Sequence, residues 1–531
     1  MSLLNIKDLS LSITGVEILH NVSVDMQPGE IVAITGESGS GKSLTALAAM
    51  ALLPRGAEVK GQIFLDENDI LTTSELELCA IRGRKIGMVF QEPMTALNPV
   101  KTIGSQVAET ILIHERISKT EANRRAKDML RRVGLEVSPL RYPHELSGGQ
   151  RQRVVIAMAI VLRPKLLIAD EPTTALDVTT QARILKLLKD LVVSFDMGLL
   201  IITHDLAVVA EIADKIVVMQ NGQIVETAKT EVLLYNMKHP YTRALFNAST
   251  HRVVMPDVIA SGTLLSVDSV FRTYSLPRNG ILGSRPNFNA LDNVDFHIGH
   301  GERVGLVGES GCGKSTLTRA ILGVEDVQSG QITLDGEPVF SGNKPNLDVR
   351  RKMQVVFQDP YSSFNPRHRV DRLIAEPLHV LENPPVGKLK DLAILKALED
   401  VGLMGSDAKK FIHEFSGGQR QRIAIARALI IEPELIIFDE AVSALDVSVR
   451  AQVLDLISEL CQQRSLAYLF ISHDLSVVRS VTDRVMIMRA GKIVEHGETE
   501  KVFTNPQNAY TKTLIAAAPR LPEAIYAIEP V

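Results

Sequence analysis

A glycine-rich segment between an apolar run and a helix-forming run constrains this chain more than any other feature. The apolar run at residues 31–34 predicts a buried strand, and residues 44–50 favour a helix. Backbone N–H groups of such a loop, with the N-terminus of the following helix, cradle phosphate oxygens. The segment predicts a nucleotide site in which Lys42 reaches the β- and γ-phosphates and the Ser43 hydroxyl ligates Mg²⁺. It meets the pattern G-x-x-x-x-G-K-[ST] with Gly36, Glu37, Ser38, Gly39, Ser40, Gly41, Lys42 and Ser43.

The chain contains this segment twice. Three other motifs recur with one spacing, because 416 − 147, 439 − 170 and 473 − 204 all equal 269. A single spacing indicates a duplicated domain. We therefore expect a first domain at residues 1–250, a linker at 251–262 and a second domain at 263–531. The second phosphate loop consists of Gly308, Glu309, Ser310, Gly311, Cys312, Gly313, Lys314 and Ser315.

Each copy has the pattern of an α/β domain. Alternating apolar residues at 9–13 and 22–24 indicate antiparallel strands. Residues 92–164 have a mostly helical pattern. Strand and helix signals alternate after Asp170, which is typical of a mostly parallel sheet covered by helices.

Composition and charge exclude several classes of protein. The 531-residue chain has a formal net charge of −4, so it carries no global basic signal for a nucleic-acid partner. A basic run at residues 124–132 fits either a nucleic-acid patch or the solvated face of an amphipathic helix, and we favour the helix. Its three cysteines lie far apart, which indicates a reducing cytosol. We expect no signal peptide, and no apolar run approaches the about 20 residues of a membrane span, so membrane work would depend on partners.

An acidic pair follows a buried apolar run in each copy. Asp170 and Asp439 end predicted strands near a phosphate loop, where a carboxylate can hold Mg²⁺. The next residues, Glu171 and Glu440, can accept a proton from an attacking water, a contribution of about 10²–10⁴-fold. A surface Asp-Glu pair is the alternative, but its recurrence at one spacing from two phosphate loops favours catalysis.

Neutral polar side chains end two further predicted strands in each copy. Gln91 and Gln358 could bind Mg²⁺ or orient water, and the alternative is a polar cap of the strand. His204 and His473 could donate to a γ-phosphate oxygen. A lone histidine at a strand end is usually structural, but the recurrence of this one favours a functional role.

A serine followed by two glycines opens a helix in each copy. Serine is a favoured N-cap, so a plain cap is the simplest interpretation. The small glycines would also let the phosphate of another molecule approach the positive end of the helix. The residues concerned are Ser147, Gly149 and Gln150 in the first copy and Ser416, Gly418 and Gln419 in the second.

With these motifs the chain resembles the ATP-binding cassette (ABC) family of transporter ATPases over nearly its whole length. The resemblance implies two tandem P-loop NTPase domains, each with a RecA-like, mostly parallel sheet core, an antiparallel β subdomain and an α-helical signature subdomain. It implies ATP and Mg²⁺ as cofactors. It also implies Walker A loops at both phosphate loops, Q-loop glutamines Gln91 and Gln358, Walker B aspartates Asp170 and Asp439, catalytic Glu171 and Glu440, and switch histidines His204 and His473. Signature motifs at 147–150 and 416–419 and D-loops at 175–177 and 444–446 complete the set.

Domains of this family pair head to tail, which implies two composite sites within one chain. Lys42 would face Ser416 and Gly418, and Lys314 would face Ser147 and Gly149. ATP would close the pair and hydrolysis would release it. Magnesium would be held by Ser43, Gln91 and Asp170 at one site and by Ser315, Gln358 and Asp439 at the other.

Segments 90–99 and 357–366 and the tails 239–242 and 508–511 resemble the peptide and nickel importer branch, and the tandem arrangement resembles the ATPase of peptide and microcin C importers. This implies two transmembrane permease subunits, a periplasmic substrate-binding protein, and a peripheral position at the cytoplasmic face of the inner membrane. Two alternatives stay open. One is the tandem ATPase of a sugar-type importer, and the other is a soluble ribosome-acting factor of the same superfamily, which would have a longer, charged linker.

The two copies differ from each other at the predicted nucleotide sites. The family usually stacks an aromatic ring on adenine, and Tyr274 fits that position in the second copy. Ile13 occupies it in the first, so we expect weaker adenine stacking there. Leu44 follows the first Walker A serine where Thr316 follows the second, which removes one possible phosphate-contacting hydroxyl.

Overall fold

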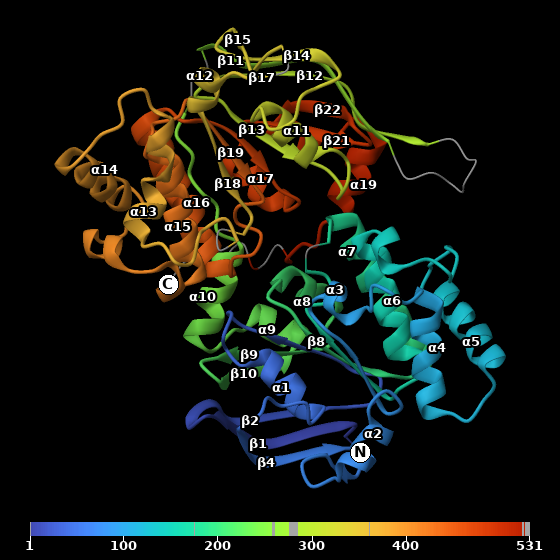
Figure 1. Ribbon diagram of the computed structural model, residues 1–531. Coiled ribbons are helices and arrows are strands. Elements are labelled where there is room, and N and C mark those ends of the chain that lie inside the picture. The colour runs from blue at the N-terminus through green and yellow to red at the C-terminus, as the bar shows by residue number, and fades with distance from the viewer. Residues whose placement is uncertain are drawn as a thin grey trace. The chain divides into compact units, whose positions relative to one another are not determined.

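The chain forms two compact units, one comprising Met1–Thr250 with Pro519–Val531 and the other His251–Ala518. We call these unit 1 and unit 2; each consists of helices packed around β-sheets (Figure 1). The computed structural model describes residues 2–174, 176–257, 261–275, 285–342, 344–359, 362–522 and 525.

The ends of unit 2 differ from the domain limits expected from the sequence. Leu521 and Ile525 are buried in a core cluster of unit 1, so the C-terminal segment groups with that unit and not with the second copy. The start of the expected linker belongs to unit 2, because the Ser458 hydroxyl donates to the Val254 carbonyl at 2.7 Å. Strand β11 already begins at Ser261, and linker residues 258–260 lie outside the described residues.

Unit 1 contains an antiparallel sheet of order β2-β1-β4-β5 and a six-stranded sheet of order β10-β9-β3-β8-β7-β6. In the larger sheet all neighbours pair in parallel except β9 and β10. The strands are β1 (Leu4–Ile13), β2 (Val16–Met26), β3 (Ile31–Thr35), β4 (Ala57–Leu65), β5 (Asn68–Asp69), β6 (Ile86–Val89), β7 (Leu166–Asp170), β8 (Gly198–Ile202), β9 (Lys215–Gln220) and β10 (Gln223–Lys229).

Residues 93–160 carry four of the α-helices of unit 1 and one 3-10 helix, in agreement with the helical pattern of that region. The helices of unit 1 are α1 (Lys42–Ala49), α2 (Glu75–Ile81), α3 (Pro93–Ala96), α4 (Ile103–His114), α5 (Lys119–Arg132), the 3-10 helix η1 (Pro143–Glu145), α6 (Gly148–Ile160), α7 (Val178–Phe195), α8 (Leu206–Ile212), α9 (Thr230–Tyr235) and α10 (Pro240–Ser249).

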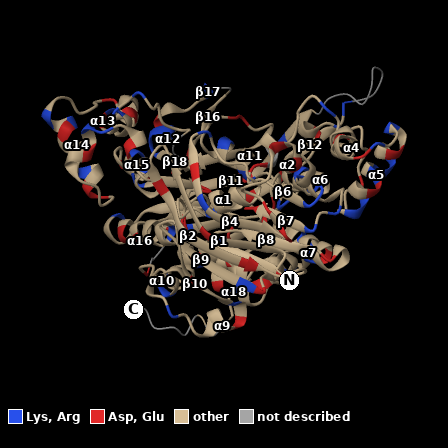
Figure 2. Ribbon diagram, turned by 90° about the horizontal axis from the view of Figure 1, so that it is seen from below, with Lys and Arg blue, Asp and Glu red and all other residues tan. Residues whose placement is uncertain are grey.

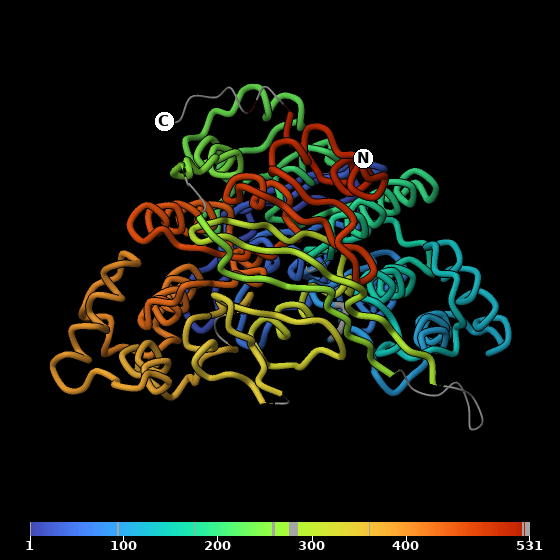
Figure 3. The backbone as a smooth tube through the Cα atoms, turned by 90° about the horizontal axis from the view of Figure 1, so that it is seen from above, coloured from blue at the N-terminus to red at the C-terminus, as the bar shows by residue number. Residues whose placement is uncertain are grey.

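Unit 2 repeats this topology, with sheets of order β12-β11-β14-β15 and β18-β19-β20-β13-β21-β22 and an added hairpin of β16 and β17. Strands β11 and β12 are longer than their counterparts and run side by side (Figure 3). The strands are β11 (Ser261–Ser275), β12 (Asn287–His300), β13 (Arg303–Val307), β14 (Ser329–Leu334), β15 (Glu337–Pro338), β16 (Phe340–Ser341), β17 (Lys344–Pro345), β18 (Met353–Phe357), β19 (Leu435–Asp439), β20 (Ala467–Ile471), β21 (Arg484–Arg489) and β22 (Lys492–Glu498).

The helices of unit 2 follow the order of unit 1. They are α11 (Lys314–Ile321), α12 (Leu347–Arg351), α13 (Val370–Ile374), η2 (Glu376–Val380), α14 (Lys388–Glu399), η3 (Gly405–Lys409), η4 (Ile412–Glu414), α15 (Gly417–Leu429), α16 (Val447–Arg464), α17 (Leu475–Val481), α18 (Thr499–Thr504) and α19 (Ala509–Ala517).

Strand β3 shows why the central strands are continuous apolar runs. Its alternate residues face opposite sides of the sheet, as the period of a strand requires. Ile31 and Ala33 belong to one core cluster, and Val32 and Ile34 belong to another. A parallel sheet covered on both faces selects such runs. The last residue of β3 therefore has a fixed position, and the phosphate loop begins immediately after it.

Helix α5 has the amphipathic structure that the basic run suggested. Its buried residues are Ala122, Ala126, Met129 and Leu130. Arg124 forms ion pairs with Glu121 and Asp128 at 2.6 and 2.9 Å. Lysine and arginine residues predominate on α5, with acidic residues among them (Figure 2). Among the described residues, no helix is long and apolar enough to cross a membrane.

Candidate active sites

The phosphate loop of each unit follows the first central strand and leads into a helix whose N-terminal residue is the Walker A lysine. Gly36, Gly39 and Gly41 have φ values of 145, 80 and 96°, which favour glycine. A Cβ atom on Gly36 would lie closer than 3.0 Å to the Met219 carbonyl oxygen of β9, and one on Gly308 would meet Met488 in the same way. The loop thus packs too closely on the neighbouring strand for any larger residue at its first position.

The Walker A lysines are buried and held by the loop itself. Lys42 Nζ donates to the carbonyl oxygens of Gly36 and Glu37 at 2.9 and 2.8 Å. Lys314 Nζ makes the same two bonds, at 2.6 Å to Gly308 and 3.0 Å to Glu309. The loop carbonyls therefore hold the positive charge of each lysine at the phosphate loop.

The predicted magnesium ligands of unit 1 lie together. Ser43 Oγ donates to Asp170 Oδ1 at 3.1 Å. Burial raises the pKa of Asp170, although the Ser43 hydrogen bond opposes the shift. Burial also raises the pKa of Asp439 in unit 2. A cation would stabilise the ionised form of either carboxylate.

These oxygen donors fit Mg²⁺, which is bound through one or two carboxylates, hydroxyls, water and substrate phosphates. The described residues contain no cluster of three or more His, Cys, Asp or Glu side chains able to hold a metal ion. The protein side of the site would therefore be completed by nucleotide phosphates and water.

Glu171 lies at the centre of a polar cluster in unit 1. Its carboxylate is 3.2 Å from His204 Nδ1 and accepts hydrogen bonds from Gln91 Nε2 and Thr174 Oγ1, each at 2.9 Å. Burial alone would raise the pKa of Glu171, but the bonds from His204 and Thr174 and the Lys42 charge outweigh it and lower the pKa to about 2. Its backbone has a φ of 47°, a strained conformation that is typical of functional sites.

Glu440 occupies the equivalent position in unit 2 with fewer side-chain contacts. His473 Nδ1 lies 3.5 Å from its carboxylate, and its hydrogen bond lowers the pKa of Glu440. Burial lowers the pKa of His473, but the bond to Glu440 outweighs it and raises that pKa. Among the contacts of the described residues, Gln358 makes none to Glu440, in contrast to Gln91 in unit 1.

The signature segments form the helix caps that serine favours. Ser147 Oγ accepts from the Gln150 amide at 3.3 Å, and Gln150 Oε1 accepts from the Ser147 amide at 3.0 Å. Ser416 and Gln419 form the same reciprocal pair at 3.4 and 3.1 Å. The capping interpretation is confirmed in both units. The facing of these residues toward the Walker A loop of the other unit stays a prediction.

Close packing within each unit explains why the second signature residue is a glycine, and the sequence did not reveal this packing. A Cβ atom on Gly149 would lie closer than 3.0 Å to Thr180 Cγ2 of α7. In unit 2 a Cβ atom on Gly418 would meet Val449 Cγ1 of α16 equally closely. Each signature helix therefore approaches the helix that follows the Walker B motif of its own unit.

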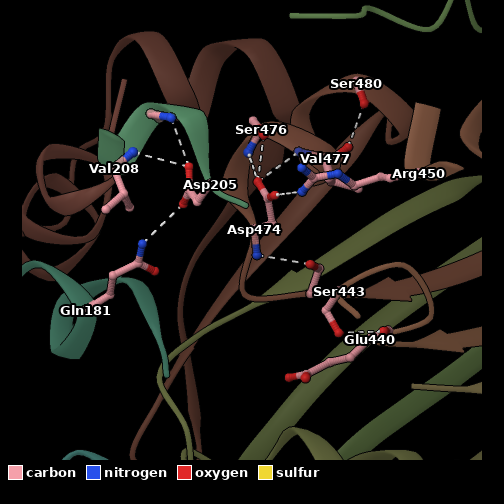
Figure 4. Close-up of polar contacts among 12 residues, drawn as sticks. Gln181, Asp205, Val208, Glu440, Ser443, Arg450, Asp474, Ser476, Val477 and Ser480 are labelled. Atoms are coloured by element: carbon pink, nitrogen blue, oxygen red, sulfur yellow. Dashed lines mark hydrogen bonds and ion pairs between the residues drawn. The ribbon is translucent and has the colours of Figure 1, made fainter. Parts of the chain in front are cut away.

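The aspartate after each histidine is held differently in the two units (Figure 4). Asp205 Oδ2 in unit 1 accepts from the neutral Gln181 side chain at 3.2 Å. Asp474 Oδ2 in unit 2 pairs with Arg450 at 2.7 Å. Both aspartates cap the helix that follows, α8 or α17, through their other oxygen. Sequence reasoning did not identify Gln181 or Arg450.

The remaining predicted residues have distinct environments. Tyr274 Oη donates to Glu325 at 2.5 Å, and the Arg272 guanidinium lies 5.1 Å from its ring centre. Leu44 packs against a core cluster of unit 1, and Thr316 is buried. The tips of the phosphate loops are exposed at Ser38, Gly39, Ser310 and Gly311, and the loops bury Ser40 and Cys312. Residue 175 of the predicted D-loop lies outside the described residues.

Comparison with known proteins agrees with this geometry. The ABC transporter family profile matches residues 19–174 and 291–443, and the profile for the oligopeptide/dipeptide transporter C-terminal region matches 225–254 and 494–529. The chain belongs to the ABC transporter family and is one of its ATPases, with two cassettes of the peptide importer type. The predicted family and the predicted α/β fold are confirmed.

Two relatives match the chain over most of their own length. The chain is 45% identical to the peptidoglycan transport ATP-binding protein YejF of Agrobacterium fabrum (strain C58), over 97% of this chain and 96% of that protein. It is 44% identical to the glutathione import ATP-binding protein GsiA of Escherichia coli (strain K12), over 94% of this chain and 86% of that protein. A solved structure of cbiO1 from Clostridium perfringens matches 46% of this chain and 94% of its own length, at 27% identity and a TM-score of 0.41.

Proposed function

We propose that this chain couples ATP hydrolysis to the import of peptides or peptide-like compounds in a bacterium. The observation that carries the substrate class is the oligopeptide/dipeptide transporter region, which follows each of the two cassettes. The relatives named for glutathione and peptidoglycan transport support it, since both names denote peptide-containing compounds. The names of the matched profiles and of these two relatives mention neither sugars nor ribosomes.

We assign each unit its own hydrolytic residues. The carboxylates of Glu171 and Glu440 accept the proton of the attacking water, and their lowered pKa keeps them ionised at neutral pH. His204 and His473, next to these carboxylates, hold a γ-phosphate oxygen. ATP is bound by the two phosphate loops with Lys42 and Lys314. Mg²⁺ is held by Ser43, Gln91 and Asp170 in unit 1 and by Ser315, Gln358 and Asp439 in unit 2, and supplies charge neutralisation at the phosphates.

Each site is completed by the signature segment of the other unit. Ser416 and Gly418 then face Lys42, while Ser147 and Gly149 face Lys314. ATP closes the two units and hydrolysis releases them. Family membership implies membrane permease partners. We propose two of them, contacted by the segments after Gln91 and Gln358, with a periplasmic binding protein that delivers the substrate. The chain is then peripheral to the cytoplasmic face of the inner membrane.

The assigned bases are tested by the double variant Glu171→Gln and Glu440→Gln. We expect ATP to stay bound while phosphate release falls by more than about 100-fold, the contribution of a general base. Glu231→Gln, on the exposed surface of α9, is the matched control and keeps full turnover. Near-normal turnover in the double variant would contradict the assignment of both glutamates.

The substrate class needs a separate experiment. The chain is purified together with the membrane permeases that copurify with it, reconstituted in vesicles, and supplied with a labelled dipeptide, glutathione, a muropeptide or maltose. We expect ATP-dependent uptake of a peptide-containing compound. Uptake of maltose alone, or copurification with ribosomes in place of permeases, would reject the peptide importer.

A further inference from the structure

A tyrosine of each importer-type tail contacts the phosphate loop of its own unit. Tyr241, near the start of α10, accepts a hydrogen bond at its hydroxyl from the Glu37 amide at 3.1 Å. Tyr510, near the start of α19, accepts one from the Glu309 amide at 3.2 Å. The two tyrosines are 510 − 241 = 269 residues apart, the spacing of the catalytic motifs. The contact is thus a repeated feature of the cassette and its tail.

The bonded amide belongs to the peptide group that also holds the Walker A lysine. In unit 1 the peptide between Gly36 and Glu37 offers its carbonyl oxygen to Lys42 Nζ and its N–H to Tyr241. In unit 2 the peptide between Gly308 and Glu309 is held in the same way by Lys314 and Tyr510. Because a peptide group is planar, a tyrosine that fixes the N–H also fixes the direction of the carbonyl.

The tyrosine is itself anchored to the edge of the central sheet. Both oxygens of Glu226, on β10, accept backbone N–H groups of Lys238 and His239 at 2.8 and 3.1 Å. The His239 side chain then accepts from the Tyr241 amide at 3.2 Å as the cap of α10. The tail therefore enters its helix in a defined direction and presents the tyrosine to the loop.

Unit 2 repeats this anchor with different side chains. Glu495, on β22, accepts from the backbone amides of Gln507 and Asn508 at 2.7 and 3.1 Å. Asn508 caps α19 by accepting from the Tyr510 amide at 2.8 Å. The capping residue is therefore histidine in unit 1 and asparagine in unit 2, whereas the contact between the tyrosine and the phosphate loop is the same in both.

The ring of Tyr510 also has a cation–π contact in unit 2. The Arg489 guanidinium lies 4.7 Å from the centre of the Tyr510 ring, a cation–π distance. The residue 269 positions earlier, at the end of β9, is Gln220, which carries no charge. The charge of Arg489 is therefore not repeated at the equivalent position of unit 1.

We propose that Tyr241 and Tyr510 are positioning residues for nucleotide binding, through which the C-terminal region of each cassette sets the ATP affinity of its own Walker A loop. Each hydroxyl binds the peptide group whose carbonyl accepts a hydrogen bond from the Walker A lysine. The tail therefore helps to position both the phosphate loop and its lysine. This inference rests on the proposed ATP sites at Lys42 and Lys314.

The test uses the full-length chain and removes only the hydroxyl. Tyr241→Phe is made together with Lys314→Ala, so that the loop of unit 1 alone binds, and Tyr510→Phe is made together with Lys42→Ala. Binding of AMP-PNP with Mg²⁺ is measured by isothermal titration calorimetry. Loss of one hydrogen bond predicts a Kd about two- to tenfold higher than that of the parent lysine variant. Tyr235→Phe, whose side chain is 69% exposed on α9, is the control.

Steady-state kinetics separate a positioning role from a structural one. In an otherwise unchanged chain, Tyr241→Phe with Tyr510→Phe should raise KM for ATP and leave kcat within about twofold, since Glu171 and Glu440 are untouched. A lower unfolding temperature and lower kcat with unchanged KM would reject the proposal and assign the hydroxyls to fold stability.

Two further outcomes are diagnostic. A Kd equal to that of the Tyr235→Phe control, while the double variant Lys42→Ala with Lys314→Ala loses binding, would reject the tyrosine proposal and leave the ATP sites in place. Full binding by the double lysine variant would reject the ATP sites themselves.

Arg489→Gln should weaken AMP-PNP binding at unit 2 and leave binding at unit 1 unchanged. Equal effects on both loops would contradict the role of the contact between Arg489 and Tyr510.

Discussion

Arg450 Nη1 lies 2.7 Å from Asp474 Oδ2, next in sequence to the predicted switch histidine His473, and in unit 1 the uncharged Gln181 side chain takes the place of the arginine beside Asp205. Burial would raise the pKa of Asp474, but the Arg450 charge outweighs it and lowers that pKa. The loop before α17 is therefore held by an ion pair, whereas the loop before α8 is held by a hydrogen bond from an uncharged amide.

Replacing Arg450 with glutamine should destabilise unit 2 at neutral pH. A charge-assisted hydrogen bond contributes about 1.5–3 kcal/mol, which corresponds to roughly 3–12 °C in the unfolding temperature of a domain of this size. The stabilisation by an aspartate of lowered pKa is complete above its ordinary value of about 3.9 and is lost as the pH falls through the lower folded value. Differential scanning calorimetry between pH 3 and pH 7 measures the difference.

The converse variant Gln181→Arg is the control for this prediction. It should raise the unfolding temperature of unit 1 at pH 7, because it supplies Asp205 with the partner that Asp474 has. If the deficit of Arg450→Gln has the same size at pH 3 as at pH 7, the ion pair is not its source.

Replacing the second signature glycine with alanine should lower the stability of each unit through a clash with a helix of the same unit. Gly149→Ala would place a Cβ atom against Thr180 Cγ2, and Gly418→Ala would place one against Val449 Cγ1. Overpacking of this kind costs about 1–3 kcal/mol. We expect lower unfolding temperatures and lower ATPase rates for both variants. Gly417→Ala, where a Cβ atom would have nothing within 4 Å, should keep the unfolding temperature.

A second substitution can separate packing from phosphate binding. Thr180→Ser removes the clashing methyl and keeps the hydroxyl that donates to Asp177 at 3.0 Å. Thr180→Ser should therefore restore the stability and the ATPase rate of Gly149→Ala. Restored stability without restored ATPase activity would show instead that Gly149 is needed for the approach of a phosphate.

The adenine platform should make the two sites unequal in affinity. Tyr274 is held by Glu325 and Arg272 in unit 2, and its counterpart in unit 1 is Ile13. An aromatic contact contributes about 0.5–1.5 kcal/mol, so Lys42→Ala should bind AMP-PNP roughly two- to tenfold more tightly than Lys314→Ala. Ile13→Tyr should reduce this difference in a calorimetric titration. Equal residual affinities of the two lysine variants would refute the inequality.

The fold and the principal site residues were predictable because they depend on local patterns. The strand–loop–helix arrangement around Lys42 is encoded within residues 31–50, and the duplication supplied an independent check on each motif. The apolar run before Asp170 fixes that residue at the end of a central strand. Its neighbour Glu171 then contacts His204, because β7 and β8 are adjacent and parallel and end at the same edge.

The contacts missed by sequence reasoning join segments that are distant in sequence. Gly149 packs on Thr180 only because α6 and α7 cross, and no local pattern encodes that crossing. The tail tyrosines were recognised as signs of a subfamily, but their hydroxyls meet an amide about 200 residues earlier. The packing of Leu521 and Ile525 in a core cluster of unit 1 was also not foreseen, because apolar residues fit a core without specifying which one.

The Walker A lysines form hydrogen bonds to carbonyl oxygens of their own loop, so nucleotide binding would exchange these acceptors for phosphate oxygens. Lys42 Nζ already has two carbonyl acceptors, and phosphate oxygens must compete with them. Entry of ATP would therefore replace existing bonds of the lysine. An alanine at this position removes the proposed phosphate ligand and also the two hydrogen bonds that Lys42 Nζ donates to the Gly36 and Glu37 carbonyls. The expected loss of affinity in such a variant thus combines a missing phosphate contact with the loss of two bonds within the loop.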